Sequence, residues 1–384
     1  MSSHSFQNHH SDGGSNWAPI LPTVLALTFL SFVTPCFADS TSSEPANNAA
    51  SSASSKKVGG TAAHASDSAN AGSNANASGI NSGADGSAGF QPASKDSNSG
   101  KTADATSDPR ANEDARKLFS SKKRPASLPT LSIGSASCGC IAGAKKLALN
   151  GPYWQVMRPS RNRYYGHPSM LTYIEKFAKR AHDVGWESLL IGDLNMPRGG
   201  PMPTGHASHQ RGTDVDIWLQ PGPKKILSTN DREKLEASSV LKLDSAELDP
   251  KVWTAQHAAF VKAAAQDDNV ARIFVTPSIK KALCSCKSAD GSDTAWLRRL
   301  RPWEGHDDHI HVRLICPPAE KCVEQEPPPE GDGCGEELDD WMNKTALDPP
   351  HKSAHPGEVP DEPMKPFPLS KMPAECIQVL DAKP

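Results

Sequence analysis

The sequence lacks several features that would assign it to common classes of protein. Lysine and arginine total 41 against 44 aspartate and glutamate residues, so the formal net charge is −3. A chain-wide nucleic-acid-binding surface needs a strong basic excess, and this composition argues against one. Apolar residues make up only 36% of the 384 residues and aromatic residues only 6%. Part of the chain is therefore expected to remain unfolded, because it cannot bury enough apolar surface.

Long apolar runs are also missing, with one exception near the N-terminus. Residues 18–33 are apolar and are followed by small residues around Ala38, a pattern that a signal peptidase can cleave. Residues 1–16 contain no lysine or arginine, which is unusual ahead of a signal sequence. We expect residues 1–38 to be a signal peptide or, as the alternative, a single membrane anchor. Both place the rest of the chain outside the cytoplasm.

The cysteines agree with export. Eight cysteines follow Cys36, and an even number in an exported chain indicates disulfides. The alternative is structural zinc, because Cys138 and Cys140, and likewise Cys284 and Cys286, are close pairs. Structural zinc sites usually separate their cysteines by two to four residues, so disulfides are the favoured interpretation.

Composition divides the rest of the chain into three parts. Residues 39–126 are mostly Ser, Ala, Asn, Gly and Asp and end in a charged transition, so we predict a disordered linker with a short helix near 113–119. Residues 127–325 are predicted to form one domain. Residues 326–384 hold 12 of the 33 prolines and still contain cysteine. This Pro-rich tail is predicted to drape over the domain and to be stapled to it by disulfides.

Residues 127–325 show both helical and strand periodicity. Helical spacing predicts helices at 170–184, 254–267 and 277–283, and apolar or alternating runs predict strands at 188–193, 214–219, 271–276 and 309–314. The predicted fold class is α+β, with a small central antiparallel sheet that carries the site and helices that flank it.

Two histidine-rich clusters fall on predicted strands. In the second cluster His309 and His311 share one face of strand 309–314, because side chains alternate with period two. In the first cluster Asp216 lies on the polar face of its strand. If the two strands lie side by side, Asp216 and His311 can meet, and His209 reaches in from the loop before the first strand.

Two imidazoles and one carboxylate form a typical catalytic zinc set, with a fourth position left for water or substrate. We predict His209, Asp216 and His311 as the ligands. His309 projects in the same direction as His311 and is the predicted general base. The alternative, ordinary hydrogen-bonded histidines, is a poor account of five histidines in two strand-linked clusters.

Longer strings make the pattern more specific. GHASHQRGTDVDIWLQ, RYYGHPSM, LIGDLNMPRGGPM and WLRRLRPWEGHDDHIHVRLICP resemble the penicillin-insensitive murein endopeptidase family. The spacing of His209, Asp216, His309 and His311 is similar to that of a wider group of zinc peptidases, which includes lysostaphin-type enzymes, D-Ala-D-Ala carboxypeptidases and the sonic hedgehog fold. The resemblance runs from about Ser132 to Cys376.

The resemblance implies a periplasmic zinc enzyme whose partner is peptidoglycan. Its substrate would be the D-alanyl–meso-diaminopimelyl cross-link between stem peptides. It implies His209, Asp216 and His311 as zinc ligands, with His309 as the base. It further implies a metal contact at His206.

Two other positions follow from the same resemblance. His306 would orient substrate or stabilise the oxyanion. Asp244 aligns with a family aspartate at a possible second metal position, but Glu247 stands where the family has histidine. The resemblance also implies the disulfides Cys140–Cys376, Cys284–Cys334 and Cys316–Cys322. The remaining pair, Cys138 and Cys286, is predicted to form a fourth.

Three alternatives remain open at this point. The chain could be a D,D- or L,D-carboxypeptidase of the same zinc class, or a wall-binding protein without activity. An HD-type phosphohydrolase, suggested by His306, Asp307 and Asp308, needs a helix where residues 309–314 alternate as a strand. Arg198 and Arg313 are candidate partners for substrate carboxylates. Trp218 and Trp303 are predicted to pack in the core.

Overall fold

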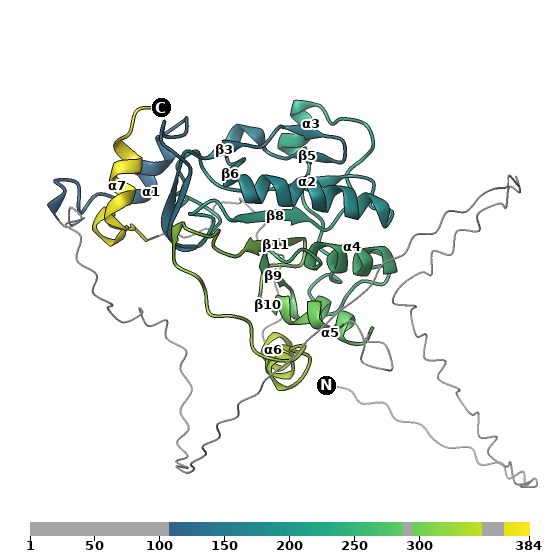
Figure 1. Ribbon diagram of the computed structural model, residues 1–384. Helices are drawn as coiled ribbons and strands as arrows, with labels where there is room; N and C mark the ends of the chain where they lie inside the picture. The colour runs from purple at the N-terminus through teal and green to yellow at the C-terminus, as the bar shows by residue number, and fades with distance from the viewer. Residues whose placement is uncertain (1–106, 287–293, 348–364) are drawn as a thin grey trace, which may run out of the picture. The chain divides into compact units, whose positions relative to one another are not determined.

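The computed structural model describes residues 107–286, 294–347 and 365–384 (Figure 1). The predicted signal peptide or anchor at 1–38, and residues 39–106 of the predicted linker, lie outside the described residues. Within the described ranges, no helix is both long enough and apolar enough to cross a membrane.

A seven-stranded sheet with the order β10-β9-β11-β8-β7-β5-β4 forms the centre of the fold. The strands are β4 (Asn150–Gly151), β5 (Trp154–Val156), β7 (Leu189–Ile191), β8 (Asp214–Trp218), β9 (Val270–Val275), β10 (Leu300–Pro302) and β11 (His309–Leu314). The pairs β9–β11, β11–β8 and β8–β7 are antiparallel. The predicted α+β class with an antiparallel centre is confirmed, and the parallel pairs β10–β9 and β5–β7 at the flanks were not anticipated.

Two smaller sheets accompany the central one. The first has the order β12-β1-β2 and consists of β1 (Leu131–Ser135), β2 (Cys138–Ala142) and β12 (Lys321–Cys322). The second pairs β3 (Lys145–Lys146) with β6 (Tyr165–Gly166).

The predicted helices at 170–184, 254–267 and 277–283 are confirmed, as is the short helix near 113–119, whereas the helices at 229–234, 336–347 and 374–381 were not predicted. The helices are α1 (Ala115–Ser120), α2 (Pro168–Asp183), α3 (Thr229–Lys234), α4 (Ala255–Ala265), α5 (Pro277–Cys284), α6 (Glu336–Leu347) and α7 (Ala374–Asp381). α2 begins with proline at its first position, and the His167 side chain caps it by accepting from the Ser169 backbone N–H. The buried face of α2 meets α4, where the Tyr173 hydroxyl donates to the Ala264 carbonyl at 3.1 Å.

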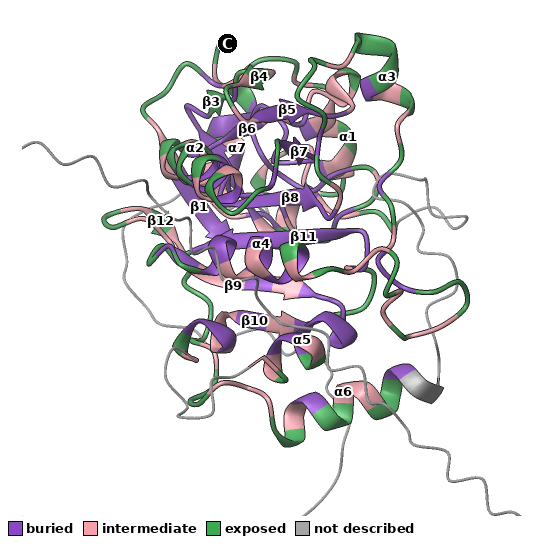
Figure 2. Cartoon of the chain, turned by 90° about the vertical axis from the view of Figure 1, so that its right-hand side faces the viewer, coloured by how far each residue is buried: buried purple, intermediate pink, exposed green. Residues whose placement is uncertain are grey.

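The central strands are buried on both faces (Figure 2). On one face Val215, Ile217, Ile310 and Val312 belong to the main apolar core. This leaves the opposite face of β8 and β11, which carries the polar side chains, covered by loops and not open to water. Charged groups on that face therefore need partners.

The packed part of the chain begins before the predicted boundary at residue 127. Phe119 of α1 is fully buried in a second apolar cluster together with Leu380 of α7, and the two helices lie next to each other (Figure 1). The Ala115 backbone N–H donates to the Phe367 carbonyl at 2.8 Å. α1, at the end of the predicted linker, therefore belongs to the fold and packs against the C-terminal helix α7.

The three disulfides that the resemblance implied are present in the described residues, and the first two of them link the tail to the domain. They are Cys140–Cys376, Cys284–Cys334 and Cys316–Cys322. The predicted Cys138–Cys286 pair is wrong, because Cys138 is a free thiol that donates to the Lys371 carbonyl at 3.1 Å. Burial raises the pKa of this thiol, which therefore stays protonated at neutral pH.

Removing the Cys140–Cys376 bond should destabilise the protein more than any single surface change. The bond closes a loop with a sequence separation of 236 residues, so the double change Cys140→Ala with Cys376→Ala is expected to lower the free energy of unfolding by about 2–5 kcal/mol. Denaturant unfolding followed by circular dichroism measures it. The control Cys138→Ala should cost less than about 1 kcal/mol; equal losses would contradict the assignment.

Candidate metal centre

The register of β8 and β11 brings the two histidine clusters together. His311 lies opposite Asp216, and Arg313 lies opposite Asp214. The meeting of Asp216 and His311 on one sheet face, predicted from period-two alternation, is therefore confirmed. His209 enters from the loop before β8 with φ of 62°, a left-handed conformation that costs a non-glycine residue roughly 1 kcal/mol or more.

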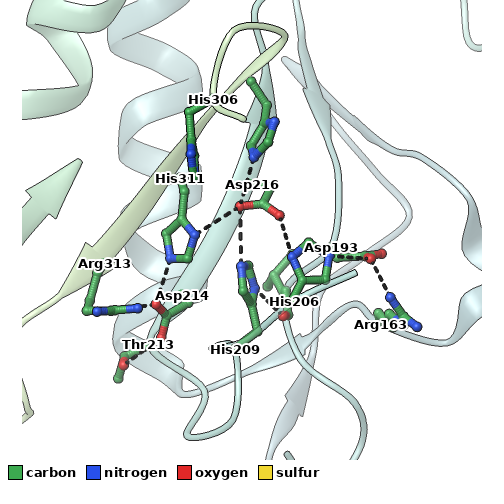
Figure 3. Close-up of polar contacts among 12 residues, drawn as sticks. Arg163, Asp193, His206, His209, Thr213, Asp214, Asp216, His306, His311 and Arg313 are labelled. Atoms are coloured by element: carbon green, nitrogen blue, oxygen red, sulfur yellow. Dashed lines mark hydrogen bonds and ion pairs between the residues drawn. The ribbon is translucent and has the colours of Figure 1, made fainter. Parts of the chain in front are cut away.

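Four imidazoles surround the Asp216 carboxylate (Figure 3). His209 Nε2 lies 3.3 Å, His311 Nδ1 3.4 Å and His309 Nε2 3.7 Å from Oδ1. His206 Nδ1 lies 3.3 Å from Oδ2. All five side chains are at least nine-tenths buried, so the centre is screened from bulk water.

The outward nitrogen of each predicted ligand is fixed by a hydrogen bond. His209 Nδ1 donates to the Leu194 carbonyl at 2.6 Å, and His311 Nε2 donates to Asp214 Oδ1 at 2.8 Å. Arg313 Nε donates to the same Asp214 oxygen at 2.6 Å (Figure 3). These bonds set the tautomers, so His209 Nε2 and His311 Nδ1 present lone pairs toward Asp216.

Asp193 fixes His206 in the same way. Its Oδ2 accepts from His206 Nε2 at 2.9 Å and from Arg163 at 2.8 Å (Figure 3). Burial would raise the pKa of Asp193, but His206 and the arginines hold it well below its ordinary value. Asp193 is therefore ionised and orients the Nδ1 lone pair of His206 toward Asp216.

The cluster fits a metal ion. His209 Nε2 and both Asp216 oxygens are buried without a hydrogen-bond partner, which costs about 1–3 kcal/mol for each polar atom. Donor atoms of His206, His209 and Asp216 all lie within 4.8 Å of one another. A divalent cation among them would satisfy these atoms together, and a mixed set of imidazole and carboxylate ligands suits such an ion.

The charges in the centre also suit a cation. Burial opposes ionisation of Asp216, yet the imidazoles, His209 first, hold its pKa well below the ordinary value. Burial lowers the pKa of His311 to about 4, so this imidazole is neutral at pH 7. Burial alone would lower the pKa of His309, but the carboxylates of Asp216 and Asp308 raise it to about 9.

Other predicted positions are placed differently. Asp244 is exposed in the loop between α3 and α4, outside the cluster around Asp216, and Glu247 pairs with Lys242 at 2.5 Å. The structure therefore does not bring Asp244 to the metal centre. His306 does join it, with its ring centroid 4.9 Å from that of His309.

The two candidate substrate arginines are structural. Arg198 Nη1 donates to the Val379 and Leu380 carbonyls at 2.7 Å each and so caps α7. Arg313 is buried against Asp214, as described above. Trp218 is buried as predicted, but the prediction for Trp303 is wrong, because 53% of its surface is exposed.

Sequence reasoning missed Asp193 and the role of Asp308. Asp308 Oδ1 accepts from His309 Nδ1 at 2.6 Å. Asp193 follows a buried apolar strand, and a carboxylate at the end of such a strand is a usable signal. Asp308 was noticed only for the HD-type alternative, which β11 excludes because the histidines lie on a strand.

Buried, oriented nitrogen and oxygen donors on a strand face define a candidate metal-dependent enzyme, and known proteins narrow the class. The chain matches the sequence profile of a family described as penicillin-insensitive murein endopeptidase over residues 132–381. The chain belongs to this family.

Relatives of that name come from several bacteria. The protein from Haemophilus influenzae is 45% identical over 253 residues, which is 65% of this chain and 82% of the relative. The protein from Klebsiella pneumoniae subsp. pneumoniae is 43% identical over 251 residues, 65% of this chain and 86% of the relative. The protein from Yersinia pestis bv. Antiqua is 44% identical over 236 residues, which is 61% of this chain and 82% of the relative.

Asp216→Ala should abolish stoichiometric metal binding, because Asp216 lies at the centre of all four imidazoles. The wild-type chain is expected to hold metal after dialysis and to gain thermal stability when the ion is added. Elemental analysis and thermal unfolding measure both. The control Asp244→Ala should bind like the wild type; loss of metal in this variant would restore Asp244 to the site.

Asp193→Asn tests His206 as a ligand. Loss of a carboxylate that orients a ligating histidine typically weakens metal affinity by about 10- to 100-fold. Competition with a chromophoric chelator measures the affinity. Asp183→Asn, at an exposed aspartate paired with Lys179, is the matched control. Wild-type affinity in Asp193→Asn would exclude His206 from the ligand set.

Proposed function

We propose that the chain is a zinc-dependent peptidoglycan endopeptidase that hydrolyses D-alanyl–meso-diaminopimelyl cross-links. One observation carries the proposal. The β8–β11 register gathers His209, Asp216 and His311 with His309 beside them, in a chain whose relatives are named murein endopeptidases.

His209, Asp216 and His311 would hold the zinc ion, with His206 as a further contact. Three protein ligands of this type are usual for catalytic zinc. When bound, such an ion polarises a carbonyl and lowers the pKa of water to about 7. The ionised Asp216 and neutral His311 are already in the protonation states that ligands need.

His309 moves the proton. Its Nδ1 hydrogen bond to Asp308 directs Nε2 into the centre and stabilises the imidazolium. With a divalent cation held beside Asp216, a positive charge on His309 would be disfavoured, so Nε2 would be free to accept a proton from the attacking water and then deliver it to the leaving amine of the diaminopimelyl residue. Asp308 acts through His309, as the carboxylate does in other carboxylate–histidine pairs.

His306 is better suited to bind substrate than to stabilise an oxyanion. Its Nδ1 donates to the Glu304 carbonyl at 2.8 Å. Burial, together with the charge of His309, holds the pKa of His306 well below its ordinary value, so the ring is neutral. A neutral ring with a proton on Nδ1 has only a lone pair on Nε2, which accepts from a substrate amide N–H.

The scheme uses no side-chain nucleophile. A β-lactam inhibits by acylating a serine, and no serine takes part in the proposed proton transfers. Insensitivity to penicillin follows from the use of water as the nucleophile.

We also propose that the chain is exported to the periplasm. The three disulfides of the described chain favour an oxidising compartment. Residues 1–38 would supply the signal peptide, and peptidoglycan would be met on the same side of the membrane.

Mass spectrometry of the reaction products tests this function. The oxidised full chain with zinc should convert a cross-linked stem-peptide dimer into two monomers, with one water added in total. A chelator should stop the reaction. A dimer shortened by one alanine would indicate a carboxypeptidase instead, and an untouched dimer with zinc-loaded protein would indicate a wall-binding protein.

His309→Ala should lower kcat by about 10²- to 10⁴-fold, the usual contribution of a general base. Asp308→Asn should give a smaller loss, because the Nδ1 hydrogen bond is weakened but the imidazole remains. Both variants should keep their zinc, as measured by elemental analysis. A His309→Ala enzyme with wild-type kcat would remove the proposed role of this residue.

A further inference from the structure

A row of aromatic rings leads from the metal centre to the surface. The exposed Trp303, directly after β10, lies against Phe274 of β9 and Trp341 of α6, with centroid separations of 5.9 Å in each case. The Phe274 ring meets the imidazole of His311 edge-on at 5.1 Å. The exposed ring is therefore one aromatic side chain away from a predicted metal ligand.

The C-terminal tail holds Trp341 beside Trp303. The disulfide Cys284–Cys334 ties the segment before α6 to α5, and α6 lies beyond β10 in Figure 2. Lys344 Nζ pairs with Glu304 at 3.0 Å and lies 5.0 Å from the Trp341 ring centroid. A large apolar ring held open to water in this way is unfavourable by itself, and covering it with a ligand would recover that free energy.

The surrounding charge selects the ligand. The sequence of α6 contains Glu336, Glu337, Asp339 and Asp340 against one basic residue, Lys344. Arg301 of β10 pairs with Glu337, which leaves the other three carboxylates of α6 in excess. A stem peptide that carries carboxylates would be repelled here. A neutral sugar ring is not repelled, and its C–H face, with a partial positive charge, packs against the negative face of an aromatic ring.

The other flank of the centre holds two arginines whose charge is met by Asp193. Arg161 and Arg163 both pair with Asp193 Oδ2, at 3.4 and 2.8 Å. These arginines follow β5, whereas Trp303 follows β10, and β8 and β11 lie between the two strands in the sheet order. The exposed aromatic rings thus lie on the flank opposite these arginines, and the carboxylates of α6 make a neutral ligand the better fit for them.

We propose that Trp303 and Trp341 form a carbohydrate-binding platform that holds a neutral N-acetylated sugar ring of the glycan strand while the stem peptide occupies the metal centre. The inference rests on the proposed function for its substrate. Binding of the sugar, however, can be measured without catalysis.

Calorimetry of the metal-free full chain with the tetramer of N-acetylglucosamine tests binding directly. The wild type should bind this peptide-free probe, and Trp303→Ala should weaken binding by about fivefold or more. Trp303→Tyr should retain most of the affinity. Ile226→Ala, at a side chain that is 60% exposed, is the control and should bind like the wild type. A wild type that does not bind, or an unaltered Trp303→Ala, overturns the proposal.

Kinetics on two substrates test the platform during turnover. The quantity is the ratio of kcat/KM for a glycan-linked dimer to that for a sugar-free peptide dimer. Trp303→Ala should lower this ratio about fivefold through KM of the glycan-linked substrate, while Ile226→Ala keeps it. A wild-type ratio in Trp303→Ala overturns the platform. If the wild type cleaves neither dimer, the proposed function fails, and calorimetry decides the carbohydrate site alone.

Discussion

The antiparallel register of β8 and β11 is the constraint on which the centre depends. It places His311 opposite Asp216, and a slip by one residue would turn every polar side chain of one strand into the apolar core. The same register buries Val215 and Val312 on the other face. Hydrophobic burial on one face of the sheet thereby fixes the geometry of the predicted metal ligands on the other.

A ring of carboxylates and carbonyls around the imidazoles keeps that geometry. Asp193, Asp214, Asp308 and the Leu194 carbonyl each accept from the outward nitrogen of one histidine. Each of these hydrogen bonds fixes both a ring orientation and a tautomer, so four similar side chains take different roles. The left-handed backbone at His209 shows that the fold tolerates local strain at one predicted ligand.

The sequence predicted those parts that depend on local periodicity. Alternation in 214–219 and 309–314 predicted the ligand pair, and apolar spacing predicted α2. It could not predict that Trp303 is exposed, because burial depends on what packs across the sheet. Asp193 was missed for a similar reason, since its partner His206 lies 13 residues away and meets it only in the folded chain. Composition also misplaced the boundary at 127, because only two buried residues of α1, Ala115 and Phe119, hold that helix in the fold.

The contact between the first and last described segments has a consequence for how the enzyme can be trimmed. The Ser127 backbone N–H donates to the Lys383 carbonyl, and Arg110 pairs with Asp381. A fragment that starts at 127, where composition suggests a domain border, would uncover the apolar side of α7 and remove its ion-pair partner. The catalytic unit is therefore best isolated from residue 107 or earlier, with its C-terminus left free of fusions.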